Sequence, residues 1–146
     1  MPLSRPKPRA SARAVTSARG QPAAIGRVFR RVIADVAPLP VAGHFHDTRG
    51  LGLANVLAAF EAGCRAFDAS LGGLGGCPFA PNATGNIVFE DTVFMFAAMV
   101  VETGIDIEKL GRVRDLLARA LPDVTLYGAI AKAGLPRNFH PLAQAA

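Results

Sequence analysis

Two histidines, one cysteine and one asparagine carry the side chains of this sequence that are best suited to a chemical site. His44 and His46 are separated by one residue, and residues 41–43 before them show no helical pattern. We therefore predict a strand on which both imidazoles point to the same face. Two neutral imidazoles on one face chelate a divalent metal ion better than one does. A pair of structural histidines that only make hydrogen bonds is the alternative, and the spacing alone leaves both interpretations open.

A glycine-rich loop over residues 72–86 carries the cysteine and ends at the asparagine, Asn86. Its length favours a functional role. Cys77 stands between Gly76 and Pro78, so its loop could bring the thiol over a substrate as a proton donor or acceptor. An inert side chain in a turn is the alternative. The loop lacks the Lys-Ser/Thr pair of a Walker motif and the spacing of a dinucleotide-binding loop.

Other polar and thiol side chains near these motifs have structural interpretations. Asp47 and Thr48 follow the histidines and are candidates for the N-cap of the next helix. Asp47 could also accept a hydrogen bond from an imidazole, although we expect capping to be its main role. Cys64 follows a helix-ending glycine, so we predict a buried structural thiol. Glu90 stands where an acidic residue favours the start of a helix.

From Pro22 onward the apolar pattern predicts alternating helices and strands. The predicted helices cover residues 22–38, 53–63, 90–101 and 106–121, and the predicted strands cover residues 40–45 and 64–71. The apolar stripe is Ile25, Val28, Phe29, Val32, Ile33 and Val36 in the first helix, and Ile107, Leu110, Val113, Leu117 and Leu121 in the last. Beyond Pro122 we predict a surface-wrapping tail. This order is typical of a parallel α/β protein, in which functional side chains follow the strands.

The composition favours one globular domain with a basic first segment. A chain of 146 residues, 51% of them hydrophobic, can bury one core of ordinary size. Residues 1–21 hold five basic residues and no acid, which accounts for the net charge of +5. No aromatic residue lies among those cations, so we expect no nucleic-acid partner. The longest apolar run, residues 93–101, is too short to cross a bilayer, so we expect no membrane partner.

We expect residues 1–21 to be disordered in isolation, because they contain early prolines and no periodic apolar pattern. Their arginine and serine content is similar to that of an organellar presequence, but the prolines disfavour an amphipathic helix. The chain has only two cysteines, which fits a reducing, cytoplasmic compartment. The mitochondrial matrix is the alternative location.

Three stretches of the chain resemble the C-terminal half of 3-hydroxy-3-methylglutaryl-CoA (HMG-CoA) lyase. They are HFHDTRGLGLAN over residues 44–55, FDASLGGLGGCPFA over residues 67–80, and ATGN over residues 83–86 with Glu90 and Asp91 after it. The resemblance extends from about Pro22 to Leu117, and more loosely through residues 126–128 and 133–136. Related Claisen-type synthases share the His-x-His pattern but not the Gly-Gly-Cys-Pro loop, which makes the resemblance specific.

The resemblance implies an α/β fold that is a partial TIM (β/α)8 barrel, made of about the last three β/α units and C-terminal helices. Residues 1–21 would then be a disordered basic segment, residues 22–121 the barrel portion and residues 122–146 a C-terminal extension. It also implies one divalent cation, Mg²⁺ or Mn²⁺. The implied metal ligands are His44, His46 and Asn86, the implied catalytic residues are Cys77 and His44, and Asp47 and Glu90 are implied to support the ligands.

The resemblance further implies metal-dependent retro-Claisen cleavage of HMG-CoA to acetoacetate and acetyl-CoA, with either Cys77 or His44 protonating the acetyl-CoA enolate. The family's first barrel strand supplies an Asp ligand beside an Arg, and nothing here matches them, since no acid precedes Asp35. We therefore expect a homo-oligomer or a complementing chain as partner, besides the acyl-CoA substrate. A catalytically inactive fragment that binds at most a metal or a partner is the alternative.

Overall fold

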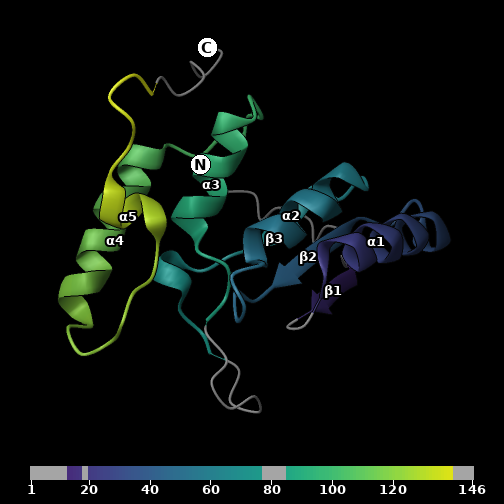
Figure 1. Cartoon of the computed structure of the whole chain (residues 1–146), viewed down its shortest axis with the longest axis horizontal. Coiled ribbons are helices and arrows are strands. Elements are labelled where there is room, and N and C mark those ends of the chain that lie inside the picture. Colours follow the sequence, from purple (N-terminus) through teal and green to yellow (C-terminus); the bar gives the residue numbers. More distant parts are fainter. Residues whose placement is uncertain (1–12, 18–19, 77–84, 140–146) are drawn as a thin grey trace, which may run out of the picture.

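The computed structural model describes residues 13–17, 20–76 and 85–139, and its strands form one parallel sheet (Figure 1). Strands β1 (Arg13–Ser17), β2 (Val41–Phe45) and β3 (Ala66–Asp68) lie in that order across the sheet. In the register of the sheet, His44 of β2 is paired with Asp68 of β3. Because parallel strands share one direction, the residues that follow β2 and β3 meet at the same edge.

Helices α1 (Pro22–Val36) and α2 (Gly52–Glu61) pack side by side and share a core with the sheet. The buried residues of this core are Ile25, Phe29, Val41, Phe45, Val56, Ala59, Cys64, Ile87 and Phe96. Burial alternates along β2, because successive side chains of a strand point to opposite faces. Val41 and Phe45 therefore face the core, and the half-buried His44 points to the opposite side.

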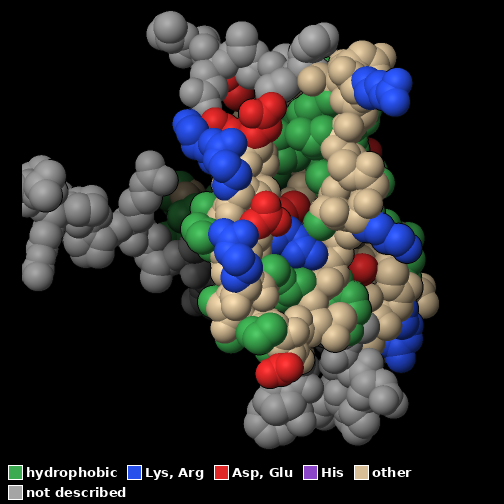
Figure 2. Space-filling view, turned by 90° about the vertical axis from the view of Figure 1, so that its left-hand side faces the viewer, with side chains coloured by type: hydrophobic (Ala, Val, Ile, Leu, Met, Phe, Trp, Pro, Cys, Tyr) green, Lys and Arg blue, Asp and Glu red, His purple; other side chains and the backbone are tan. Residues whose placement is uncertain are grey.

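A second, smaller apolar cluster connects α3 (Phe89–Ala98) with α4 (Ile107–Ala120). Its buried members are Val93, Ile107 and Leu110, and Leu135 and Phe139 pack against it from beyond helix α5 (Ala129–Ala133). The backbone N–H of Lys109 donates to Asp106 Oδ1 at 2.9 Å, which confirms Asp106 as the cap of α4. On the face that carries α4 and α5, acidic, basic and apolar side chains lie interspersed (Figure 2).

The structure differs from the prediction at β1, which lies inside the segment predicted to be disordered in isolation. All five residues of β1 are in register with β2. A strand that forms by pairing with a neighbour depends on tertiary context, and local composition does not encode that pairing. Residues 1–12 lie outside the described part of the chain.

The predicted strand over residues 64–71 is also too long. Strand β3 ends at Asp68, and the short 3-10 helix η1 (Leu71–Gly73) follows after an isolated pairing of Ser70 with Val88. Gly72 has a φ of +58°, which is incompatible with an extended strand and turns the chain away from the sheet.

Two apolar stripes are buried over less of their length than predicted. In α1, Val28 is 44% exposed, and in α4, Val113 is 47% exposed. Helix α4 is held at its N-terminal end, where Ile107 and Leu110 are buried, so its later turns lie at the surface. The region predicted as a tail contains α5. Among the described residues, no helix is long and apolar enough to span a membrane.

Candidate metal centre

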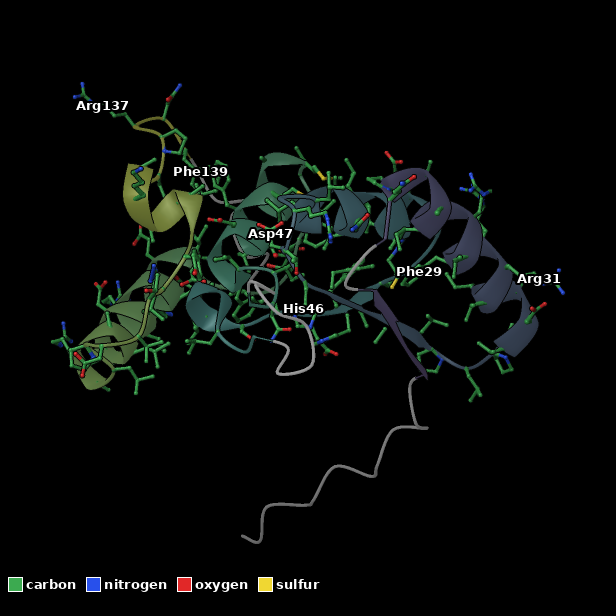
Figure 3. All side chains as sticks on the ribbon, turned by 60° about the horizontal axis from the view of Figure 1, so that its bottom comes forward. Phe29, Arg31, His46, Asp47, Arg137 and Phe139 are labelled. Atoms are coloured by element: carbon green, nitrogen blue, oxygen red, sulfur yellow. The ribbon has the colours of Figure 1, made fainter. Side chains whose placement is uncertain are left out.

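His44 and His46 lie together at the carboxyl end of β2, as the sequence predicts. Their ring centroids are 5.2 Å apart, with the rings in an edge-to-face arrangement. His44 Nδ1 lies 3.7 Å from Asp68 Oδ2 on the neighbouring strand, too far for a direct hydrogen bond. Figure 3 shows His46 and Asp47 near the middle of the molecule, between the end that carries Phe29 and the end that carries Phe139.

Asn86 is brought to the same place by backbone pairing, although it lies forty residues further along the chain. It pairs with His46 in an isolated antiparallel bridge. The N–H of Asp47 donates to the carbonyl of Gly85 at 3.2 Å, and the N–H of Ile87 donates to the carbonyl of Phe45 at 3.1 Å. Paired residues of an antiparallel bridge project to the same side, so the Asn86 amide and the His46 imidazole share one face.

The amide of Asn86 is oriented by two hydrogen bonds that use only its nitrogen. Asn86 Nδ2 donates to Ser70 Oγ at 3.0 Å and to the carbonyl of Leu74 at 2.9 Å. Both acceptors precede the residues that lie outside the description, so the start of the glycine loop itself fixes the amide. Its oxygen, Oδ1, is therefore held in one direction, and no described residue donates a hydrogen bond to it.

Two polar atoms of this site are buried without a hydrogen-bond partner among the described residues, Asn86 Oδ1 and His46 Nδ1. Each such atom costs about 1–3 kcal/mol unless a ligand satisfies it. An amide oxygen and imidazole nitrogens are donors that suit a divalent cation. Within the described ranges, no three His, Cys, Asp or Glu side chains gather closely enough to hold a metal ion. The amide of Asn86 is the further oxygen-bearing group on the face of the His46 imidazole.

Asp47 holds the start of α2. Its Oδ1 accepts a hydrogen bond from the N–H of Gly52, the first residue of the helix, at 2.7 Å. This agrees with the predicted main role of Asp47 at the helix N-terminus, although the N-cap position itself is occupied by Leu51. Thr48 does not cap the helix, because its buried hydroxyl has no hydrogen-bond partner in the described structure.

Glu90 lies at the base of the glycine loop and does not hydrogen-bond to the histidines. Its carboxylate is 3% exposed and accepts from the N–H of Gly72, with distances of 3.2 Å to Oε1 and 3.1 Å to Oε2. Arg114 of α4 forms an ion pair with it, Nε lying 3.2 Å from Oε1. Glu90 thus binds the backbone of Gly72 from the side of α3.

The HMGL-like family model matches residues 14–117 of this chain, more than two thirds of its length. The chain belongs to the HMGL-like family. The match begins at Ala14, in β1, eight residues before the expected start of the resemblance.

Known members of the HMGL-like family are similar to the chain in sequence and in structure. (R)-citramalyl-CoA lyase of Chloroflexus aurantiacus is 42% identical over 73% of this chain and 33% of its own length. Hydroxymethylglutaryl-CoA lyase YngG of Bacillus subtilis is 45% identical over 61% of this chain and 30% of its own length. The chain therefore spans about one third of the length of these relatives.

The fold of this chain is also similar to that of a solved lyase structure. An HMG-CoA lyase from Acinetobacter baumannii, in complex with coenzyme A and 3-methylmalate, superposes with a TM-score of 0.78 at 45% identity. The superposition covers 88% of this chain and 42% of that chain. The arrangement of strands and helices described above is thus found within a larger member of the HMGL-like family.

Of the two cysteines of this family member, only Cys64 lies in the described residues, and Cys77 lies outside them. Cys64 is 1% exposed, and its single S–H has two carbonyl acceptors within reach, that of Ala66 at 3.2 Å and that of Val41 at 3.4 Å. Burial raises the pKa of the Cys64 thiol above its ordinary value of 9.0. The prediction of a buried structural thiol is confirmed.

Three residues near the site were not singled out in the sequence. Asp68 and Ser70 alternate with Phe67 and Ala69, so strand periodicity places them on the face of the histidines. That signal was present in the sequence. Arg114 gives no such signal, because its contact with Glu90 depends on how α4 docks against α3.

Proposed function

We propose that this chain carries the metal-binding side of an acyl-CoA lyase site, whose reaction is the cleavage of HMG-CoA to acetoacetate and acetyl-CoA. The observation that carries the proposal is that His46 Nδ1 and Asn86 Oδ1, on two residues paired in one bridge, are buried without a hydrogen-bond partner in the described part of the chain. The names of the relatives, which include hydroxymethylglutaryl-CoA lyases and a citramalyl-CoA lyase, support an acyl-CoA substrate.

The proposed ligands of a divalent cation, Mg²⁺ or Mn²⁺, are His44, His46 and Asn86. A divalent cation bound there would supply Lewis acidity, which lowers the pKa of a coordinated hydroxyl group. Mg²⁺ and Mn²⁺ suit oxygen-containing ligand sets, and the amide oxygen of Asn86 contributes one. Asp47 and Glu90 contribute by holding α2 and the glycine loop in place.

His44 is the residue that we propose for proton transfer. It is half-buried on the face of β2 opposite the core, and its Nδ1 lies 3.7 Å from Asp68 Oδ2, so a carboxylate stands beside the imidazole. In the reaction, a base takes the proton of the tertiary hydroxyl, the carbon–carbon bond breaks, and its electron pair passes to the acetyl-CoA enolate. Cys77 or His44 then returns a proton to carbon, so that the two products form with no net change in protons.

The substrate pocket would extend beyond this chain. We propose that the sheet β1-β2-β3 is part of a TIM barrel, and that a second copy or a complementing chain supplies the other strands. The span of one third of the relatives' length supports this proposal. A catalytically inactive module that binds a metal or a partner is the second candidate, which the same span favours.

An assay of the purified full chain with HMG-CoA and either Mg²⁺ or Mn²⁺ separates these candidates. Acetoacetate formation that is lost on His44→Ala and Asn86→Ala, but retained on Asn138→Ala at an exposed position, would support the lyase. A folded chain that binds Mn²⁺ and forms no acetoacetate would contradict the lyase and support the binding module.

A further inference from the structure

We infer that Arg114 is a positioning residue for the candidate metal centre, acting through the turn at Gly72. The inference rests on the proposed function, because it assumes that Asn86 is a ligand. Arg114 itself lies on α4 and makes no hydrogen bond to the histidines or to Asn86.

The side chain of Arg114 is largely buried against the acidic group that holds the turn. It is 13% exposed, and Glu90 is 3% exposed, with 3.2 Å between Nε and Oε1. The carboxylate of Glu90 in turn accepts from the N–H of Gly72. The guanidinium of Arg114 places a cation beside this buried carboxylate, which offsets the cost of burying it and holds it in position for the N–H of Gly72.

Arg114 is also connected, through Tyr127, to the carbonyl group of Gly72. Its Nη2 donates to the carbonyl of Tyr127 at 3.0 Å, and the N–H of Tyr127 donates to the carbonyl of Gly72 at 2.7 Å. Both backbone groups of Gly72 are therefore bound by partners of Arg114, the N–H by Glu90 and the carbonyl by Tyr127. One guanidinium thus joins α3, α4 and the segment before α5 around a single residue, Gly72.

The turn at Gly72 lies between the two groups that orient Asn86. These groups are Ser70 Oγ and the carbonyl of Leu74, and backbone bonds from Gly73 to Ser70 and from Leu74 to Leu71 close the turn between them. If the hydrogen bonds of Glu90 and Tyr127 to Gly72 are lost, the turn can change shape, and the distance between these two acceptors changes with it. The direction of Asn86 Oδ1 would then no longer be fixed.

The choice of arginine follows from this geometry, because the planar guanidinium pairs with the charge of Glu90 through Nε, a contact without hydrogen-bond geometry, while Nη2 donates a hydrogen bond to Tyr127. A lysine has one point charge and can pair with Glu90 or approach Tyr127, but not fix both. Arg114→Lys should therefore retain part of the effect, and Arg114→Met should lose it. Glu90→Gln added to Arg114→Met removes the unpaired charge and keeps an oxygen that accepts from Gly72.

The test uses the full chain and two measurements, Mn²⁺ affinity by calorimetry and hydrogen exchange of the Gly72 amide. For Arg114→Met we expect about tenfold weaker Mn²⁺ binding and at least about tenfold faster exchange at Gly72. Arg114→Lys should be intermediate, and the double variant Glu90→Gln/Arg114→Met should bind Mn²⁺ more tightly than Arg114→Met alone. Arg112→Met, at an exposed position of the same helix, should change neither value.

A role limited to general stability would give a different pattern. Ile25→Ala removes packing in the main core, and it should lower the melting temperature without weakening Mn²⁺ binding by the folded chain. If Arg114→Met and Arg114→Lys bind Mn²⁺ as tightly as the unsubstituted chain, the inference is wrong. If the unsubstituted chain binds no Mn²⁺, the proposed function itself is contradicted.

Discussion

Asn86 faces His46 across an antiparallel bridge, and each residue buries one polar atom that has no partner among the described residues. The amide nitrogen of Asn86 is fully engaged by Ser70 and Leu74, so the amide cannot turn to satisfy its own oxygen without losing two hydrogen bonds. Two buried polar atoms without a partner on paired residues support the proposed metal centre, because a bound cation would satisfy both.

Replacement of Asn86 should weaken metal binding more than replacement of the residue that orients it. We expect Asn86→Ala to lower Mn²⁺ affinity by at least about tenfold, because it removes the proposed oxygen ligand. Ser70→Ala removes one of two orienting hydrogen bonds and should cause a smaller loss. Titration calorimetry with Mn²⁺ measures both. Equal affinity of Asn86→Ala and the exposed Asn138→Ala would exclude Asn86 as a ligand.

Gly75→Ala should disturb the same amide by contact. Gly75 has a φ of +94°, and a Cβ there would lie 2.7 Å from Asn86 Nδ2. Gly50, with a φ of +69°, has nothing within 4 Å of its Cβ position and provides the control. Both alanine variants should lose stability, by about 1–2 kcal/mol, from the left-handed backbone. Only Gly75→Ala should also weaken Mn²⁺ binding, and equal binding by both variants would contradict the contact.

Stability should depend strongly on Phe29, which is fully buried between α1 and the sheet. Phe29→Ala should lower the free energy of unfolding by about 3–5 kcal/mol, through lost burial and a remaining cavity. Val28→Ala changes the preceding residue, which is 44% exposed, and should cost less than about 1 kcal/mol. Urea unfolding followed by circular dichroism measures both. A similar cost at the two positions would mean that the core is not packed as described.

The Cys64 thiol should make the protein less stable in alkaline solution. Its pKa is raised by burial above 9.0, so above that pH an unfolded thiol ionises while the folded one keeps its proton. The unfolded state then binds fewer protons, and the free energy of unfolding falls as pH rises. Cys64→Ala should reduce this fall between pH 8 and about pH 10. An unchanged pH profile in the variant would show that Cys64 does not titrate on unfolding.

Much of the fold could be predicted because its signals are local. Pro22 marks the start of α1, Asp106 caps α4, and the lack of a helical pattern in the residues before His44 indicates β2. Strand β1 was missed because its order comes from pairing with β2, which is a tertiary interaction. The end of β3 was misplaced because Gly72 turns the chain only in the context of Glu90 and Tyr127.

The site could be predicted where its residues share one strand or one recognisable motif. His44 and His46 follow from spacing, whereas the orientation of Asn86 depends on the backbone bridge to His46 and on Ser70. The contact of Arg114 with Glu90 joins two helices through their docking, and no periodicity indicates it. Long-range side-chain contacts of this kind require the folded structure.

Pulsed EPR of Mn²⁺ bound to the full chain tests the central claim most directly. We predict nuclear modulation from the nitrogens of two directly bound imidazoles, reduced to one in His44→Ala and in His46→Ala. Mn²⁺ that shows only water in its coordination sphere, or a spectrum that neither substitution changes, would contradict the assignment of His44, His46 and Asn86 as a metal centre.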